Sequence, residues 1–312
     1  MKTAPAISVI IPVYNYAHML SQALDSVKAQ TWNDYEVIVV DDGSTDNTAD
    51  VVSGYGDSVR YIYKQRGGAA SARNEGIRQA TAGIVAFLDA DDEWVPEKLA
   101  VQMAFWEANP QYDMIYCDMQ HVVRGEKVHH SYLHERDYKY FGSGWKYTDL
   151  LHESFVFTPS VLVRKHCFDV VGLHDETLLT CQDLDMWLRI ARSFQLGFVD
   201  EPLVIRHEHG HNNTLNAERF HLNQIKVFLR NEAESADEEV LAVLHSRLYM
   251  QYFGLGYFYF GQMRMTECRT AMQQAIHYGG FRRQALKYYV LSLIPKFALR
   301  ILGRATGRGP CA

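Results

Sequence analysis

The chain has 312 residues, of which 47% are hydrophobic and 22% charged, and its formal net charge is -6. This size allows a full buried core, and we expect one large domain with an appendage. No apolar run is long enough to span a membrane, and the run at residues 7–11 ends at Pro12 too early for a signal peptide. The five cysteines are scattered without the spacing of a zinc site or a disulfide framework, so we expect a protein of the reducing cytoplasm.

The positive charge is concentrated at one end of the chain. After Cys268 there are eight basic residues and no acidic one. The basic residues are Arg269, Arg282, Arg283, Lys287, Lys296, Arg300, Arg304 and Arg308. We expect this end of the protein to face an anionic partner or a lipid.

Apolar strands alternate with helical patterns through the first half of the chain. Strands are predicted at residues 7–11, 36–40, 59–63 and 84–88. Helices are predicted at residues 17–27, from about 45–47, and at 70–80. This alternation is typical of a parallel sheet covered by helices. The carboxyl ends of the strands form the ligand crevice of such a sheet, which makes Tyr14, Asp42 and Asp91 candidate site residues.

Three carboxylates, Asp89, Asp91 and Asp92, directly follow the strand predicted at residues 84–88. Carboxylates crowded at a strand end repel one another unless a cation lies between them, and oxygen ligands favour magnesium or manganese over zinc. The cluster therefore indicates a hard-metal site. The alternative is a helix cap next to solvated turn residues, because turns also favour Asp.

Two common phosphate-binding motifs are missing from the sequence. No GxGxxG follows the first strand and no GxxxxGK[ST] occurs, which argues against a dehydrogenase and a P-loop kinase. A nucleotide can still be held by a carboxylate at Asp42, with a metal at Asp91 neutralising a diphosphate.

Five segments, taken together and in order, resemble the motifs of family 2 glycosyltransferases. The segments are residues 8–15, 39–46, 72–76, 87–92 and 182–187. The resemblance covers roughly residues 6–214 and implies the α/β GT-A fold of nucleotide-diphospho-sugar transferases, with a mostly parallel central sheet and helices on both faces. It implies a catalytic domain at residues 1–214. The chain changes character after about residue 215, and its acidic and aromatic-rich stretches lead us to expect a helical C-terminal region at 215–312 with a basic amphipathic tail.

The resemblance also implies a donor site at the strand ends. The residues expected to bind the nucleotide sugar are Pro12, Val13, Tyr14, Asn15, Asp42, Arg73, Asp89 and Ala90. Among them, Asp42 would contact the base, Arg73 the diphosphate, and Asp89 the ribose side of a DXD motif. Asp91 would be the ligand of Mn²⁺ or Mg²⁺, with Asp92 a weaker candidate. The alternatives are a strand-ending turn with a packed aromatic at Pro12 and Tyr14, and a surface cation at Arg73.

The same resemblance assigns the general base to Asp183. Gln182 precedes it where the family usually has Glu. Gln still forms hydrogen bonds but carries no charge, and its neutrality keeps the neighbouring base ionised more easily. If that Glu is indispensable, the chain is a weak or non-catalytic relative. The alternative for Asp183 is a carboxylate that interacts with a helix dipole. Further upstream, residues 172–176 read Gly-Leu-His-Asp-Glu where the family often has Gly-Gly-Phe-Asp-Glu.

Alternate histidines follow at His207, His209 and His211. Side chains at alternate positions of an extended segment share one face, so a metal site is geometrically possible. Relatives often have a His here that contacts the metal or diphosphate; His209 is the expected one and His207 a weaker candidate. A zinc site of three histidines and a solvated loop are the alternatives.

The resemblance implies an inverting transfer of a sugar from a nucleotide donor, most often a UDP-sugar, to a hydroxyl of a glycan or lipid-linked acceptor in the synthesis of cell-surface polysaccharide. The Tyr- and His-rich residues 112–153 are a candidate acceptor pocket or an ordinary surface insertion. No nucleic-acid partner is expected. The runner-up activity, a sugar-phosphate nucleotidyltransferase, would need a Gly- and Arg-rich loop after the first strand, and this chain lacks one.

The last residues have the pattern of an interfacial helix. Lys296, Arg300 and Arg304 recur every four residues, opposite the apolar residues of segment 297–302. A tail of this kind would dock on the inner, anionic face of the plasma membrane. Packing of the same helix on the acidic body of the protein is the alternative.

Overall fold

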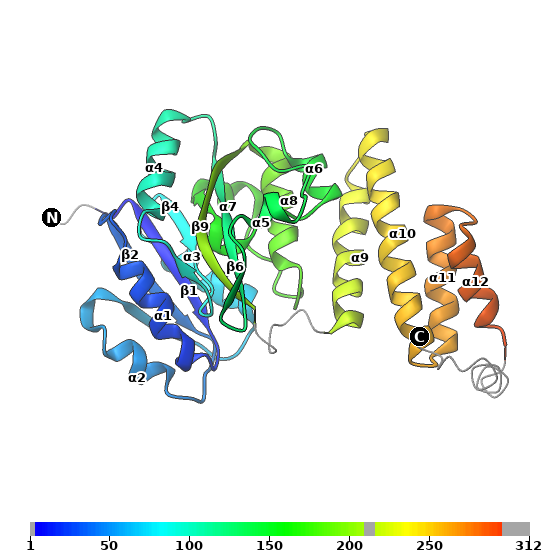
Figure 1. The fold of residues 1–312 in the computed structure, drawn as a ribbon, viewed down its shortest axis with the longest axis horizontal. Coiled ribbons are helices and arrows are strands. Elements are labelled where there is room, and N and C mark those ends of the chain that lie inside the picture. Colours follow the sequence, from blue (N-terminus) through cyan, green and yellow to red (C-terminus); the bar gives the residue numbers. More distant parts are fainter. Residues whose placement is uncertain (1–3, 209–215, 295–312) are drawn as a thin grey trace. The chain divides into compact units, whose positions relative to one another are not determined.

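The computed structural model describes residues 4–208 and 216–294. The chain divides into two compact units, Met1–Asn212 and Asn213–Ala312, and each is described here by itself (Figure 1).

The first unit is built on one mixed sheet with the strand order β3-β2-β1-β4-β8-β6-β9-β5, and β7 pairs with β6. Strands β1 (Ile7–Val13), β2 (Tyr35–Asp41), β3 (Arg60–Tyr63) and β4 (Ile84–Phe87) are parallel to one another. The residues of β1 are nearly all buried, as expected of a parallel strand covered on both faces. The four strands predicted from the sequence are confirmed.

The second half of the sheet adds antiparallel pairs. Strand β8 (Leu162–Arg164) is antiparallel to both β4 and β6 (Met114–Val123), whereas β6 is parallel to β9 (Leu196–Glu208). Strand β5 (Glu93–Trp94) pairs with β9, and β7 (Glu126–His129) with β6. Strand β6 is largely buried, so a surface insertion is a wrong description of that part of residues 112–153.

Helices connect the strands of the first unit. They are α1 (Ala17–Lys28), α2 (Thr48–Ser53), α3 (Ala69–Gln79), α4 (Lys98–Ala108), α5 (Tyr132–Glu135), α6 (Tyr147–His152), α7 (His166–Val171) and α8 (Gln182–Ser193), with 3-10 turns η1 (Gly56–Ser58) and η2 (Thr158–Ser160). Helix α3 approaches β1 closely, because a Cβ on Gly76 would lie 2.3 Å from Ile10 Cγ2. Only glycine allows this approach without repacking.

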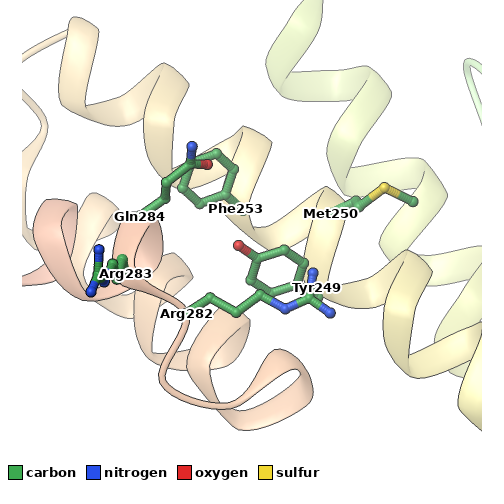
Figure 2. Close-up of a pocket in the computed structure, with 6 residues that line it drawn as sticks. All are labelled: Tyr249, Met250, Phe253, Arg282, Arg283 and Gln284. Carbon is green, nitrogen blue, oxygen red and sulfur yellow. The ribbon is translucent and has the colours of Figure 1, made fainter.

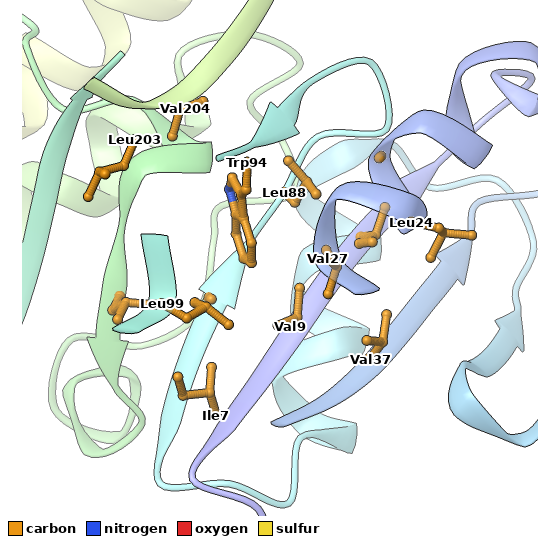
Figure 3. Close-up of a cluster of buried hydrophobic side chains, with 14 of the residues drawn as sticks. Ile7, Val9, Leu24, Val27, Val37, Leu88, Trp94, Leu99, Leu203 and Val204 are labelled. Carbon is orange, nitrogen blue, oxygen red and sulfur yellow. The ribbon is translucent and has the colours of Figure 1, made fainter. Parts of the chain in front are cut away.

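One apolar core joins both halves of the sheet. Leu24 and Val27 of α1 lie over Val9 of β1 and Val37 of β2 (Figure 3). The same core continues through Trp94 and Leu99 to Leu203 and Val204 of β9. The Trp94 indole donates to the Pro159 carbonyl at 2.8 Å, so its one polar atom is paired despite burial.

The second unit is helical. It contains α9 (Ala217–Ala233), α10 (Glu238–Gly261), α11 (Met265–Gly279) and α12 (Arg283–Leu291). The Asn216 side chain caps α9 by accepting from the Arg219 N–H, and Asp237 caps α10 by accepting from the N–H groups of Glu239 and Val240. Among the described residues, none of the helices is both long and apolar enough to cross a membrane.

Candidate active site

The carboxyl ends of β1, β2 and β4 meet at one edge of the sheet. The Asp42 N–H donates to the Val13 carbonyl at 2.9 Å, and the Leu88 N–H donates to the Ile10 carbonyl at 3.0 Å. These bonds bring Tyr14, Asp42 and Asp89 to the same edge, where a parallel sheet places its ligands. Pro12 and Val13 are the last two residues of β1 itself.

Asn15 links the first two motifs. Its backbone is left-handed, with φ at 55°, a conformation that Asn tolerates better than most residues. Its N–H donates to Ser44 Oγ at 2.9 Å, and its side-chain oxygen accepts from the Thr45 N–H at 2.8 Å. The turn after β1 is therefore held against the turn after β2.

The Asp42 carboxylate is buried and already has three donors. Lys64 Nζ and the Gly67 N–H both reach Oδ1 at 2.8 Å, and the Gly68 N–H reaches Oδ2 at 2.7 Å. Asp42 thereby orders the loop between β3 and α3. An ionised carboxylate has about four acceptor positions, so one position remains at Oδ2.

The ordered loop carries a contact that sequence analysis missed. The Arg66 guanidinium lies 3.9 Å from the centroid of the Tyr14 ring, in a cation–π arrangement. The signal in the sequence is the Arg66-Gly67-Gly68 run, which begins three residues after the end of the third predicted strand. Its position over Tyr14 depends on the bonds that Asp42 makes to the two glycines.

Arg73 on α3 is buried, and only 5% of its surface is exposed. Its Nη2 donates to Asp89 Oδ1 at 2.7 Å, while Nε and Nη1 are buried and have no hydrogen-bond partner among the described residues. The surface-cation alternative is therefore wrong. Unpaired buried donors are costly, and the two free guanidinium nitrogens beside the strand ends could pair with an anionic group.

Asn74, the next residue on α3, holds a distant loop. Its amide group donates to the His174 carbonyl at 3.0 Å and to Glu176 Oε1 at 2.8 Å, and its oxygen accepts from the His174 N–H at 2.8 Å. Both the nitrogen and the oxygen of the Asn74 side chain therefore form hydrogen bonds to the segment of His174 and Glu176. The Ala-Arg-Asn-Glu-Gly motif of residues 72–76 thus combines a buried Arg with two unpaired guanidinium nitrogens, a loop clamp and a close-packed Gly.

His174 is buried and packs against the rings of Phe87 and Trp187, at centroid distances of 6.0 and 6.2 Å. Burial, and to a smaller extent the charge of Arg73, lower the pKa of His174 to about 3. The ring is therefore neutral. Its Nδ1 lies 3.3 Å from the Gln182 carbonyl, which only accepts, so Nδ1 carries the proton. This bond connects the clamped loop to the first residue of α8.

Asp183 lies in the first turn of α8, and its Oδ1 accepts from the Leu184 N–H at 2.8 Å. The helix begins after Cys181, whose φ is 61°. The side-chain oxygen of Gln182 is buried and has no hydrogen-bond partner among the described residues. Asp185 instead pairs with Arg189 at 2.9 Å inside the protein, so the two aspartates of this turn point to different surroundings.

The carboxylates after β4 are crowded. Asp92 is buried, and its Oδ1 accepts from the His207 N–H at 3.0 Å. Burial first, and then the charges of Asp91 and Asp89, raise the pKa of the Asp92 carboxyl well above its ordinary value. Asp92 therefore contacts the end of β9, while Asp89 pairs with Arg73. Asp91, which lies between Asp89 and Asp92 in the sequence, is half-buried.

The donor set after β4 consists of hard oxygen ligands, which fit Mg²⁺ or Mn²⁺. The carboxylate oxygens of Asp89, Asp91 and Asp92 do not all lie within 4.8 Å of one another. Such an ion would accordingly take one or two carboxylates, with Asp91 the first candidate, and complete its shell with ligand phosphates and water. The weaker candidate His207 has its Nε2 2.7 Å from Glu93 Oε1, and His209 and His211 lie outside the described residues.

In the described part of the chain, Asp113, His166 and Cys167 do converge, at the amino end of β6. Burial raises the pKa of the Cys167 thiol to about 12, and Arg164 Nε lies 3.8 Å from the Asp113 carboxylate. A metal ion binds a thiolate rather than a protonated thiol, and the positive charge of Arg164 beside Asp113 repels a cation. This cluster is not a candidate metal centre.

The sequence model described as "Glycosyl transferase family 2" matches residues 8–168 of the chain. This chain belongs to glycosyl transferase family 2. An uncharacterized glycosyltransferase of Rickettsia typhi is 33% identical to it over 232 residues, which are 72% of this chain and 70% of the relative. The Escherichia coli protein named UDP-Glc:alpha-D-GlcNAc-diphosphoundecaprenol beta-1,3-glucosyltransferase WfgD is 38% identical over 105 residues, 33% of this chain and 42% of WfgD.

Solved structures share the fold of this glycosyltransferase. S. aureus TarS in complex with UDP superposes with a TM-score of 0.67 at 19% identity, covering 92% of this chain and 90% of that chain. Mannosyltransferase PcManGT from Pyrobaculum calidifontis, in complex with GDP-Man and Mn²⁺, gives a TM-score of 0.62 at 18% identity, covering 97% and 85%. The GT-A fold expected from the sequence motifs is confirmed. Asp183 lies beyond the residues that the family model matches.

Proposed function

We propose that this glycosyltransferase moves a sugar from a UDP-sugar to a hydroxyl group of a glycan or lipid-linked saccharide, with inversion at the anomeric carbon. The observation that carries the proposal is Arg73, a buried guanidinium with two unpaired donors beside Asp89 at the ligand edge of the sheet. A diphosphate is the anion that suits such a fork, because guanidinium groups bind phosphate oxygens in pairs.

The nucleoside part of the donor would lie over the ends of β1 and β2. Tyr14 and Arg66 offer a flat, partly charged surface, Pro12, Val13 and Asn15 form the backbone turn beneath, and Asp42 offers its remaining acceptor position to a base N–H. Asp89 and Ala90 would then face the ribose and sugar. UDP is favoured because TarS structures contain UDP and UDP-GlcNAc, although GDP-Man in PcManGT makes a GDP-sugar the second candidate.

A divalent ion held by Asp91, with Asp92 and a histidine of the segment that includes His207 and His209 as weaker ligands, would supply charge stabilisation to the leaving diphosphate. Mn²⁺ or Mg²⁺ fits the oxygen donors. Arg73 contributes a fixed positive charge to the same leaving group, which removes the need for an acid to protonate it.

Asp183 would accept the proton of the acceptor hydroxyl as that oxygen attacks the anomeric carbon. One carbon–oxygen bond forms while the bond from the sugar to the diphosphate breaks, so one base suffices. Gln182 carries no charge, and burial keeps the His174 imidazole neutral, so neither side chain adds a charge at the start of α8. The buried oxygen of Gln182 supports a positioning role without charge.

The acceptor is proposed to be a saccharide of a cell-surface polysaccharide, since the name of WfgD specifies a diphosphoundecaprenol-linked sugar. We place the reaction in the cytoplasm, at the inner face of the plasma membrane. The basic tail predicted to dock there, with Lys296, Arg300 and Arg304, lies outside the described residues.

Substitution of Asp183 by Asn tests the catalytic proposal. We expect turnover to fall by at least about a hundredfold, the usual contribution of a general base, while the dissociation constant of the donor stays unchanged. Asp57→Asn, at an exposed carboxylate of η1, is the matched control. If the unsubstituted protein binds sugar nucleotides but shows no turnover, it is a non-catalytic relative, which is the second candidate function and is suggested by Gln182.

A further inference from the structure

Helix α12 of the second unit presents an apolar stripe to solvent. The stripe consists of Leu286 and Val290, which lie four residues apart on the helix and are 39% and 50% exposed, and of Leu293, which lies in the turn after the helix end at Leu291 and is 53% exposed. Phe281, just before the helix, is 81% exposed. Isolated exposed apolar residues are ordinary, but four of them within residues 281–293 mark this segment as an interaction surface.

The opposite face of α12 is firmly packed, so the stripe does not result from a misplaced helix. Ala285 is fully buried, and the Tyr288 ring contacts the rings of Tyr257 and Phe260 at 5.2 and 5.0 Å. Arg269 of α11 donates to the Ser292 carbonyl at 3.0 Å. The rotation of α12 about its axis is fixed by these contacts, which leaves the stripe outward.

Cations flank the stripe. Arg282, Arg283 and Lys287 are exposed, and none of them has an ion-pair partner among the described residues. Arg282 crosses the Tyr249 ring at 4.2 Å from its centroid (Figure 2). The hollow beside it has a volume of about 460 Å³. Its lining consists of Tyr249, Met250, Phe253, Arg282, Arg283 and Gln284.

We propose that Phe281 and α12 form a docking surface for an anionic lipid bilayer, with the apolar stripe at the acyl boundary and the two arginines at lipid phosphates. A basic helix with an apolar face is the pattern of interfacial helices, and each cation near an anionic leaflet adds to the attraction. This inference does not depend on the proposed sugar transfer, because its residues all lie in the second unit.

Charge decides between a bilayer and other occupants of this face. The chain after Cys268 contains no acidic residue, so its own last residues would bring positive charge onto a positive surface. A second copy of α12 would do the same. A polyanionic glycan would match the cations but would leave Leu286, Val290 and Leu293 unused. An anionic bilayer satisfies both the cations and the stripe.

Vesicle flotation of the full chain tests the proposal. Three substitution sets are compared with the wild type on phosphatidylcholine vesicles with and without 30% phosphatidylglycerol, about that share being enough for a clear negative surface. The apolar set is Leu286→Ser, Val290→Ser and Leu293→Ser; the cation set is Arg282→Gln, Arg283→Gln and Lys287→Gln; the tail set is Lys296→Gln, Arg300→Gln and Arg304→Gln. Leu222→Ser, at an exposed leucine of α9, is the matched control.

We expect wild-type protein and Leu222→Ser to float with the anionic vesicles only, and less so at high salt. The cation set should lower the partition coefficient by roughly fivefold per cation, and the apolar set by at least about tenfold. Val290→Ser alone, with a smaller loss, replaces the apolar set if circular dichroism shows that the triple variant unfolds.

Three results would overturn the proposal. The first is binding that is equal on neutral and anionic vesicles, or no binding to anionic vesicles at all. The second is a loss of binding in the tail set while the apolar and cation sets of α12 bind like the wild type. The third is a concentration-dependent dimer in sedimentation velocity that becomes monomeric in the apolar set. Because the variants leave the first unit intact, donor binding by the same preparations separates this failure from failure of the proposed transfer.

Discussion

Acidification should destabilise the first unit through one buried imidazole, that of His174. An unfolded chain protonates this side chain around its ordinary pKa of 6.5, whereas the folded protein holds the pKa near 3. Below pH 6.5 the unfolded state therefore binds one more proton than the folded state at this residue. Stability that is fully present above that pH is lost as the pH falls toward 3.

The size of the loss follows from the two pKa values. Each pH unit within the window costs about 1.4 kcal/mol, so a change from pH 7.5 to pH 5 should lower the free energy of unfolding by about 2 kcal/mol through His174 alone. Carboxylates with ordinary pKa values titrate below this range. The raised pKa of Asp92 and the lowered pKa of His121 affect wild type and a His174 variant alike, so the difference between the two proteins reports on His174.

Urea unfolding followed by tryptophan fluorescence isolates the effect, because all five tryptophans lie in the first unit. His174→Phe introduces the residue that the family often has here and removes the titration. The variant should gain about 2 kcal/mol relative to wild type between pH 7.5 and pH 5. His18→Phe, at an exposed histidine of α1, is the control. Parallel pH dependence of wild type and His174→Phe would refute the reasoning.

Two further substitutions have matched controls. Gly76→Ala places a methyl group 2.3 Å from Ile10 Cγ2 and should lower the free energy of unfolding in urea by about 1–3 kcal/mol. The control Gly83→Ala meets nothing within 4 Å and should change that free energy by less than about 0.5 kcal/mol. Equal effects of the two substitutions would contradict the close packing of α3 on β1. Arg73→Gln removes the buried guanidinium and should weaken UDP binding, measured by calorimetry, by roughly 10- to 100-fold. The control Arg78→Gln, at an exposed arginine of the same helix, should leave UDP binding unchanged. Unchanged UDP affinity in Arg73→Gln would show that Arg73 does not bind the diphosphate.

Strands β1 and β2 were predictable because each is a local run of β-branched residues, largely buried, that ends at a polar turn. The shorter β4 and the only partly buried β3 were predictable from their places between helical patterns. The later strands were not. Strand β6 contains the buried polar residues Asp118 and His121, and its place beside β8 and β9 depends on pairing across long sequence separations. Local pattern carries little information about such pairing.

The site shows the same division. The carboxylates after β4 and Arg73 were predicted from motif residues alone. The contacts that organise them were not, since the clamp of Asn74 on His174 spans 100 residues and the Arg66 stack on Tyr14 depends on backbone bonds to Asp42. The function of His174 in holding the start of α8 is likewise visible only when both segments are placed in space.

The most direct test of the central claim is nucleotide release from a panel of UDP-, GDP-, dTDP- and CMP-sugars, with Mn²⁺ present or chelated, by the intact protein and by Asp91→Asn and Asp183→Asn. The account predicts release from a UDP-sugar that needs the metal and falls in both variants, with donor binding retained in Asp183→Asn. Release that is indifferent to chelation and to both substitutions, or an absence of both donor binding and release across the panel, would contradict it.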